Sequence, residues 1–128
     1  MEKSVKILLV EDELIIADYM QECLTRFGYK VVDTCINYNE AVKALAAKTP
    51  DIVLLDKSLG WADGCDLCQC IKSHRKLSPI PVIMFSAHTR KEDIMDNCKA
   101  DDFIAKPFEV NELLRKLNST IVAHDNRN

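Results

Sequence analysis

Five polar side chains, each at the end of a short apolar run, could together bind a metal ion and take part in phosphoryl chemistry. They provide three carboxylates, a hydroxyl and an ammonium group and belong to Glu11, Asp12, Asp56, Ser86 and Lys106. Carboxylates held close together repel one another and raise at least one pKa, unless a cation or a proton resolves the repulsion. A small set of oxygen ligands, with waters and a phosphate completing it, suits Mg²⁺, whereas Ca²⁺ needs more ligands. The residue types therefore predict a magnesium site beside a lysine.

The apolar runs that precede these residues are typical of β-strands. They cover residues 5–10, 31–35, 52–55, 82–85 and 103–105. The first, third and fourth runs are almost continuously apolar, which is expected of parallel strands that are covered on both faces. These three runs are therefore predicted to be central strands.

Segments with helical periodicity alternate with the strands. We expect helices at residues 13–27, 39–48, from 63 or 64 to about 77, at 91–98 and at 109–122. Because strand–helix–strand crossovers are right-handed, the alternation predicts an α/β fold, a doubly wound five-stranded parallel sheet with helices on both faces. Ligands of such sheets bind outside the carboxyl ends of the strands, which is where the five polar residues lie.

Length and composition limit the class of protein. A chain of 128 residues fits a single domain, for which we expect a core at about residues 4–122 and a loosely ordered tail at 123–128. The net charge is −3 and no basic stripe occurs, so direct binding to nucleic acid is not expected. Neither a signal peptide nor an apolar stretch of membrane-spanning length is present, and we therefore predict a cytoplasmic protein without membrane contact.

Six cysteines are present, and we expect buried or half-buried free thiols rather than a disulfide framework. Four potential zinc ligands lie close together in the sequence at Cys65, Cys68, Cys70 and His74. On a helix the first two lie on one side and the last two on nearly the opposite side, so they cannot converge on a tetrahedral ion.

Several segments together resemble the receiver domains of two-component response regulators, including chemotaxis-type and sporulation-relay single-domain regulators. The segments are residues 6–13, 51–56, 63–64, 84–87 and 101–108, and the resemblance extends over about residues 4–122. The resemblance implies a flavodoxin-like sheet with strand order 2-1-3-4-5.

The resemblance also implies roles for individual residues. Asp56 is expected to be the phosphoacceptor. Mg²⁺, for which Mn²⁺ can substitute, is expected to bind Asp12, Asp56, Glu11 mainly through water, and the backbone carbonyl of Ser58. Lys106, Ser86 and the backbone N–H groups of Lys57 and Ala87 are expected to contact the phosphoryl group.

A second set of implied roles concerns the response to phosphorylation. Ser86 and Phe103 are expected to move and so to change the face formed by the fourth helix, fifth strand and fifth helix. Phe103 lacks the hydroxyl group of the Tyr that many relatives carry. Ser58 and His88 hold positions that modulate dephosphorylation in the family.

The phosphodonor implied by the resemblance is a sensor histidine kinase or a histidine phosphotransfer protein. The implied output is a protein effector bound in trans. Homodimerisation on activation is a further expectation. The chain is expected to be a regulator that assists its own phosphotransfer and autodephosphorylation, either complete or as a piece of a longer protein. Two alternatives stay open: a haloacid-dehalogenase-like phosphohydrolase, and a degenerate receiver that acts only as a binding module. The hydrolase places a second Asp two residues after its nucleophile, where this chain has Ser58.

Overall fold

The computed structural model describes residues 4–60, 62–87 and 90–127, with only the backbone of residue 127 included. Five strands form one parallel sheet in the order β2-β1-β3-β6-β7. Because β4 and β5 form a separate hairpin, this is the predicted flavodoxin-like order 2-1-3-4-5, and the predicted fold class is confirmed. The strands of the sheet are β1 (Lys6–Val10), β2 (Lys30–Cys35), β3 (Ile52–Asp56), β6 (Val82–Ser86) and β7 (Asp102–Ala105).

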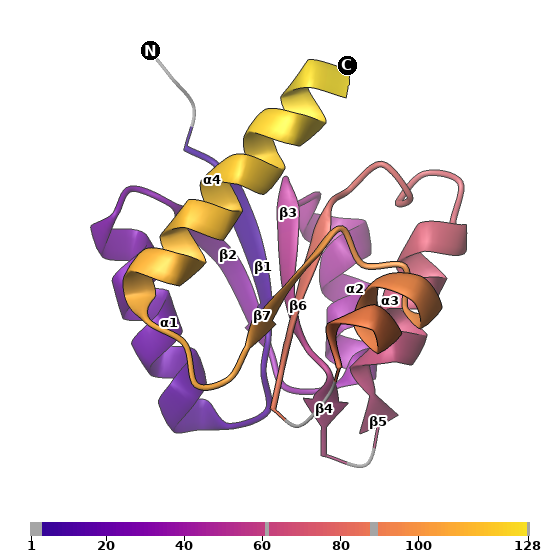
Figure 1. Cartoon of the computed structure of the whole chain (residues 1–128), viewed down its shortest axis with the longest axis horizontal. Helices are drawn as coiled ribbons and strands as arrows, with labels where there is room; N and C mark the ends of the chain where they lie inside the picture. Colours follow the sequence, from indigo (N-terminus) through magenta and orange to yellow (C-terminus); the bar gives the residue numbers. More distant parts are fainter. Residues whose placement is uncertain (1–3, 61, 88–89, 128) are drawn as a thin grey trace.

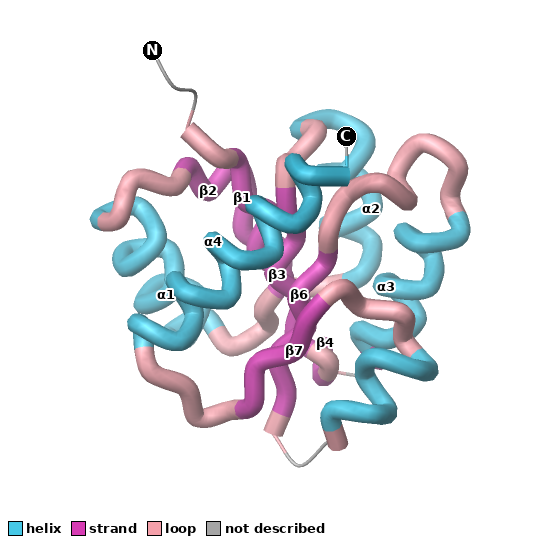
Figure 2. Tube along the Cα trace, turned by 45° about the horizontal axis from the view of Figure 1, so that its top comes forward, coloured by secondary structure: helices cyan, strands magenta, loops and turns pink. Residues whose placement is uncertain are grey.

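Helices cover both faces of the sheet. They are α1 (Leu14–Arg26), α2 (Tyr38–Lys48), α3 (Gly64–Ser73), the π-helix η1 (Asp93–Asn97) and α4 (Val110–Arg127). Figures 1 and 2 show α1 and α4 on one face and α2, α3 and η1 on the other. In the part of the chain that the structure describes, none of these helices combines the length and apolarity needed to cross a membrane.

Strand β1 illustrates why the central runs are almost continuously apolar. Its side chains alternate between the two faces of the sheet. Ile7 and Leu9 belong to the core cluster that includes residues of α1 and α4, whereas Leu8 and Val10 belong to the cluster that includes residues of α2 and α3. All four are fully buried, so the strand has two apolar faces.

Two helix ends differ from the prediction by more than two residues. Helix α3 ends at Ser73 instead of about residue 77, because His74 has an extended backbone with ψ 127° and a series of turns follows. Helix α4 continues through Arg127, so the expected loosely ordered tail is largely helical. Neither Gly nor Pro occurs between residues 110 and 127 to end that helix, although its apolar stripe stops at Ile121.

A short hairpin follows β3 and was not predicted. It pairs β4 (Ser58–Leu59) with β5 (Ala62–Asp63) in antiparallel orientation, and Figure 1 shows it beside the carboxyl ends of the sheet strands. Leu59 anchors the hairpin in the core with only 2% of its surface exposed. Two-residue strands are too short to produce a recognisable periodicity in the sequence.

Cys65 and Cys98 form a disulfide, with 4.9 Å between their Cα atoms. The expectation of buried or half-buried free thiols was therefore wrong for this pair. It was also wrong for Cys70, which is free but exposed, whereas Cys23, Cys35 and Cys68 are free and buried or half-buried. The two bonded cysteines are 33 positions apart, and their approach depends on how α3 packs against the segment after η1. The sequence contains no local signal for that contact.

Candidate functional site

Three carboxylates meet at the carboxyl ends of β1 and β3. These strands are neighbours in parallel register, with Val10 opposite Leu55, so the residues that follow them come side by side. One oxygen from each of Glu11, Asp12 and Asp56 lies within 4.8 Å of the other two. Glu11 is fully buried and Asp56 is 3% exposed, whereas Asp12 is partly buried. The sequence prediction that these three residues converge is thus confirmed by the geometry.

Lys106 reaches the same cluster from β7, two strands away from β3. Its Nζ atom lies 2.9 Å from Oδ2 of Asp56 and 3.2 Å from Oε1 of Glu11. The ammonium group also lies 5.1 Å from the ring centroid of Phe85, within cation–π range. The backbone N–H of Lys106 donates to the carbonyl of Ser86 at 2.9 Å and holds the lysine at the end of the sheet.

The electrostatics of the cluster follow from burial and from the neighbouring charges. Burial, followed by the hydrogen bond and the negative charge of Asp56, raises the pKa of Glu11 to about 8, although Lys106 opposes this rise. Burial lowers the pKa of Lys106, but the hydrogen bonds and charges of Asp56 and Glu11 outweigh it, so that the pKa ends above its ordinary value. At neutral pH, a proton on Glu11 and the charge of Lys106 together offset the crowding of the carboxylates.

This group of oxygens fits a magnesium ion. It comes from carboxylates alone, it is partly open through Asp12, and it carries more negative charge than one lysine can balance once Glu11 is ionised. Glu11, Asp12 and Asp56 are the residues that would hold the ion. Among the described residues this is the one cluster of His, Cys, Asp and Glu side chains with ligand atoms close enough to share a metal.

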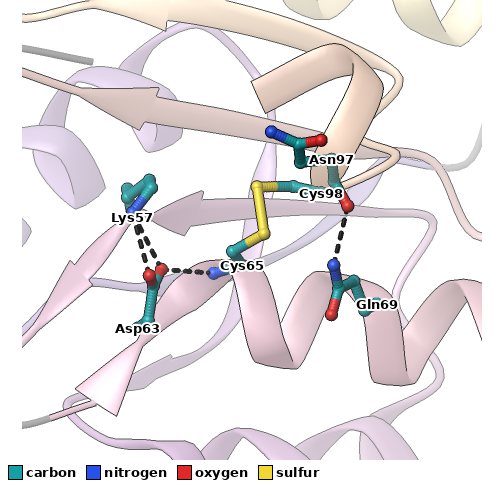
Figure 3. The surroundings of a disulfide bond; sticks show 6 residues. All are labelled: Lys57, Asp63, Cys65, Gln69, Asn97 and Cys98. Atoms are coloured by element: carbon teal, nitrogen blue, oxygen red, sulfur yellow. Dashed lines mark hydrogen bonds and ion pairs between the residues drawn. A yellow bond between two sulfur atoms is a disulfide. The ribbon is translucent and has the colours of Figure 1, made fainter. Parts of the chain in front are cut away.

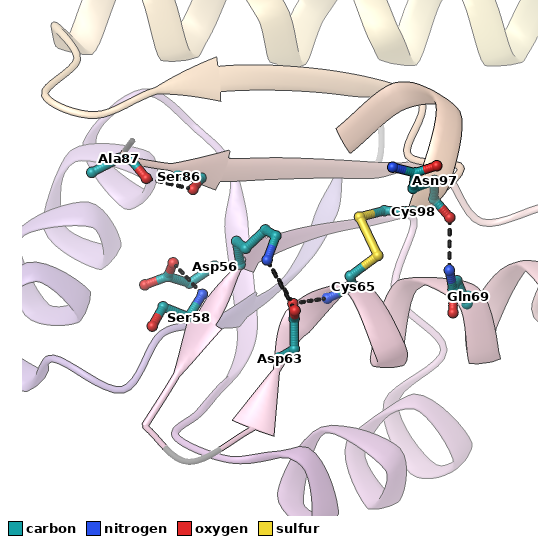
Figure 4. Close-up of polar contacts among 10 residues, drawn as sticks. Asp56, Ser58, Asp63, Cys65, Gln69, Ser86, Ala87, Asn97 and Cys98 are labelled. Carbon is teal, nitrogen blue, oxygen red and sulfur yellow. Dashed lines mark hydrogen bonds and ion pairs between the residues drawn. A yellow bond between two sulfur atoms is a disulfide. The ribbon is translucent and has the colours of Figure 1, made fainter. Parts of the chain in front are cut away.

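The residues after Asp56 differ in part from their expected roles. The N–H of Ser58 donates to Oδ1 of Asp56 at 3.0 Å, as Figure 4 shows. The N–H of Lys57 donates to the carbonyl of Phe85 at 3.0 Å and is engaged in the sheet, so the role expected of this amide is not supported by the structure. The Lys57 side chain turns to Asp63, with 2.9 Å between Nζ and Oδ2, as Figure 3 shows.

The remaining predicted site residues lie around the end of β6 and β7. Ser86 is 5% exposed, and its Oγ donates to the carbonyl of exposed Ala87 at 3.0 Å (Figure 4). Phe103 is 8% exposed and belongs to the core cluster that also contains Ile94 of η1. His88 lies outside the described residues.

Two glycines support the acidic cluster, although sequence reasoning gave them no role. A Cβ atom at Gly64 would overlap the carbonyl oxygen of Asp56 and lie 3.0 Å from the Cα of Lys57. Gly60 has φ +63°, and a Cβ there would contact Oδ2 of Asp12 at 3.6 Å. The Asp63–Gly64 pair after a strand was the available signal for the first close approach.

Gly64→Ala is expected to lower the free energy of unfolding by about 1–3 kcal/mol, because the new methyl group displaces the backbone of Asp56. The displacement should also weaken Mg²⁺ binding. Urea unfolding and magnesium titration would measure both effects. The matched control is Gly28→Ala, where φ is +94° but no atom lies within 4 Å of the added Cβ. The control should lose only about 1 kcal/mol and keep its magnesium affinity, and equal magnesium affinity in both variants would contradict the proposed contact.

Mg²⁺ is expected to raise the melting temperature, and to raise it more at about pH 8 than at about pH 6. The pKa of Glu11 is about 8 in the folded protein against 4.5 for the ordinary group, so the metal-free native state holds a proton that the unfolded chain releases. The free energy of unfolding without metal therefore falls as the pH rises between these two values. Mg²⁺ binds the ionised carboxylate and therefore competes with the proton of Glu11. The rise in pH removes this proton, so Mg²⁺ should bind more tightly at the higher pH. Thermal unfolding at both pH values, with about 10 mM Mg²⁺ or a chelator, measures the effect.

The control for this experiment is Glu11→Gln, which keeps the size of the side chain and removes its titration. The magnesium effect in this variant should depend much less on pH between about 6 and 8. An equal dependence in variant and wild type would contradict the assignment to Glu11. If Mg²⁺ leaves the melting temperature of the wild type unchanged at both pH values, the metal site itself is ruled out.

Known proteins share both the fold and these sequence features. A family model described as “Response regulator receiver domain” matches residues 7–118. The chain is 36% identical over 127 residues to “Probable transcriptional regulator ycf27” of Cyanidium caldarium, an alignment that covers 95% of this chain and 48% of that protein. The chain thus spans about half the length of this curated relative.

Two solved structures extend the comparison. The signal receiver domain of a signal transduction histidine kinase from Syntrophus aciditrophicus is 30% identical with a TM-score of 0.85, covering 94% of this chain and 92% of that one. The receiver domain of a sensor histidine kinase from Pseudomonas aeruginosa is 29% identical with a TM-score of 0.81, covering 93% of this chain and 98% of that one. The latter structure has a magnesium ion coordinated in its active-site cleft. The chain therefore belongs to the response-regulator receiver domains of two-component signal transduction.

Proposed function

We propose that Asp56 accepts a phosphoryl group, in a Mg²⁺-dependent reaction, from a phosphohistidine of a sensor histidine kinase or a histidine phosphotransfer protein. The observation that carries this proposal is the environment of one buried carboxylate. Lys106 lies 2.9 Å from one oxygen of Asp56, the Ser58 N–H lies 3.0 Å from the other, and Glu11 and Asp12 complete a metal-sized acidic cluster. As a receiver domain, the chain is a signalling module and not a classical enzyme.

Phosphoryl transfer depends mainly on positioning and on neutralisation of the phosphoryl oxygens, since little acid–base chemistry is required. The sheet positions Asp56 as the nucleophile, and Lys106 supplies a fixed positive charge beside it. Glu11, Asp12, Asp56 and the carbonyl of Ser58 would hold the metal. Bound Mg²⁺, or Mn²⁺ in its place, adds positive charge next to the phosphoryl oxygens. The hydroxyl of Ser86 and the N–H of Ala87 would donate hydrogen bonds to the same oxygens.

The proposed signal is a change of the face formed by η1, β7 and α4. Phosphorylation adds about 1.5 to 2 negative charges at the end of β3. In the proposed switch, the Ser86 hydroxyl leaves the Ala87 carbonyl, which it contacts at 3.0 Å, and turns to the phosphoryl group. Phe103 then repacks in the core behind it. A protein effector that prefers the altered face, or a second copy of the chain, would bind there in trans.

An apolar surface beside the acidic cluster suits the phosphodonor protein. Leu14 and Ile15 begin α1 immediately after the metal-binding residues, and their side chains are 62% and 86% exposed. Large exposed apolar side chains next to a reactive pocket are typical of a protein interface. A kinase or phosphotransfer domain docked on them would bring its phosphohistidine to Asp56, and the proposed setting for this exchange is the cytoplasm.

Two other functions are not favoured. A haloacid-dehalogenase-like phosphohydrolase needs an acid–base carboxylate two residues after its nucleophile, where exposed Ser58 stands. A degenerate receiver that only binds partners would have no use for a buried acidic cluster, which is costly to maintain. We assign Ser58 and His88 to control of autodephosphorylation and hence of the phosphoryl lifetime.

The proposal is tested by the intact mass of the protein after incubation with acetyl phosphate, with Mg²⁺ or with a chelator. We expect one phosphoryl group per chain with Mg²⁺, its slow loss after removal of the donor, and no label with chelator. Label that forms equally well without metal would contradict the proposal. Continuous hydrolysis of the donor without accumulation of labelled protein would favour a phosphohydrolase instead.

A further inference from the structure

The Cys65–Cys98 disulfide joins two functionally different parts of the domain. Cys65 is the second residue of α3, and Cys98 is the C-terminal cap of η1. Figure 3 shows the bond bridging the start of the one helix and the end of the other. In cytosolic proteins of mesophiles, such bonds are usually transient and either catalytic or redox-sensing.

One end of this link lies against the proposed phosphorylation site. The N–H of Cys65 donates to Oδ1 of Asp63 at 2.9 Å, and Asp63 is the partner of Lys57, the residue directly after Asp56. Gly64 donates its N–H to the carbonyl of Lys57 and packs against the backbone of Asp56. Cys65 therefore directly follows a residue that lies against the backbone of Asp56.

The other end lies on the face that the proposed switch changes. Cys98 is 1% exposed and belongs to the core cluster that contains Phe103. Two more contacts connect α3 with the same segment: Nε2 of Gln69 lies 2.7 Å from the Asn97 carbonyl, and Nζ of Lys72 lies 2.6 Å from Oδ2 of Asp101. Positions 65, 69 and 72 form one stripe of α3. The disulfide is the covalent member of this series of contacts between α3 and residues 97–101.

The two bonded cysteine residues differ in accessibility. Cys65 is half-buried at the N-terminus of α3, whereas Cys98 is buried. Other thiols are less suited to exchange, because burial raises the pKa of both Cys35 and Cys68 to about 12. Exposed Cys70, on the same helix as Cys65, is free in this structure.

We propose that Cys65 and Cys98 form a thiol–disulfide switch that fastens η1 to α3 and limits the response of the η1–β7–α4 face to phosphorylation of Asp56. The coupling rests on the proposed function, while the bond itself does not. The oxidant is a low-molecular-weight disulfide. The Cys65 thiolate attacks one of its sulfur atoms and releases one thiolate, and the Cys98 thiolate then attacks the Cys65 sulfur of the mixed disulfide and releases the second. Two protein thiols lose two electrons, and the small disulfide becomes two thiols with the two protons.

The first test compares hydrogen exchange of the full chain in the disulfide form and after reduction by a small dithiol, with the oxidation state checked by intact mass and alkylation. Amides of residues 93–98 should exchange at least about tenfold faster after reduction. Cys98→Ala and Cys65→Ser should exchange like the reduced protein under both conditions. The matched control, Cys70→Ser, should retain the full contrast. Equal exchange in both forms of the wild type, or a contrast that survives in Cys65→Ser and Cys98→Ala, would overturn the proposal.

The second test adds Mg²⁺ and acetyl phosphate to both forms. The change in exchange that phosphorylation causes at η1 and β7 should be at least about twofold larger in the reduced form. A response of equal size in both forms would overturn the coupling. Absence of label on Asp56 in both forms would reject the proposed function. Loss of the exchange contrast between the two forms is a different result and would reject the redox link.

Discussion

Asp56→Asn is expected to abolish Mg²⁺-dependent labelling by acetyl phosphate, a loss of more than about a thousandfold in rate. The amide keeps the size of the side chain but lacks the charged oxygen that attacks phosphorus. It also removes one of the three carboxylates that lie within 4.8 Å of one another, so magnesium affinity should fall as well. Intact mass measured over time, with peptide mapping of any residual label, checks the first effect, and a magnesium titration checks the second.

The control for this variant is Asp63→Asn. Asp63 ends β5 of the hairpin after β3. It is exposed, pairs with Lys57 and caps α3, a position where Asn serves as well as Asp. This variant should be labelled at the wild-type rate. If label persists in Asp56→Asn, the acceptor is another residue. If Asp63→Asn loses label to the same extent as Asp56→Asn, the loss gives no basis for naming a specific acceptor.

Glu11 should respond to the same substitution. Its pKa is raised first by burial and then by Asp56, through a hydrogen bond and through charge. With a neutral amide at position 56, the charge contribution disappears and Lys106 is left with Glu11 as its nearest carboxylate. The pKa of Glu11 should therefore fall below about 8, and the stability of the metal-free variant should decline less between pH 4.5 and 8 than that of the wild type.

The order of the sheet and the acidic cluster could be predicted because they rest on strong regularities. Buried parallel strands require apolar residues on both faces, and β1 and β3 have them. Once the strands are placed, their carboxyl ends define where Glu11, Asp12 and Asp56 must converge. Lys106 follows the same rule, although only the structure shows that its side chain spans the end of β6 to reach Asp56.

Other features depend on contacts that leave no local pattern. The hairpin of β4 and β5 has two residues in each strand, and the Cys65–Cys98 bond depends on how α3 meets the end of η1. The N–H group that contacts Asp56 belongs to Ser58 and not to Lys57, because the Lys57 amide takes the next hydrogen bond of the sheet, to Phe85. Residue type carries no information about the direction of a backbone N–H, so the sequence could not distinguish these two amides.

Lys106→Ala is expected to leave Mg²⁺ binding at least as tight as in the wild type, to slow phosphorylation and to prevent the response of the η1–β7–α4 face. Removal of the ammonium group leaves Glu11 and Asp56 without their cation, and both carboxylates are buried. Breaking a buried ion pair of this kind typically costs about 3–5 kcal/mol. Added Mg²⁺ should restore part of that loss, and should restore more in the variant than it adds to the wild type.

The pH dependence gives this prediction its sharpest form. Lys106 lowers the pKa of Glu11, so its removal should raise that pKa further above about 8. The carboxyl group is then protonated in the metal-free native state up to a higher pH, and the stability lost relative to the wild type should be smallest at about pH 5 and largest above about pH 8. Urea unfolding at several pH values measures this difference.

The control is Lys57→Ala, which removes a partly exposed pair with Asp63 and should cost only about 0–1 kcal/mol at any of these pH values. Equal losses in the two variants, or a full change in hydrogen exchange on phosphorylation of Lys106→Ala, would show that Lys106 neither balances the carboxylates nor transmits the signal.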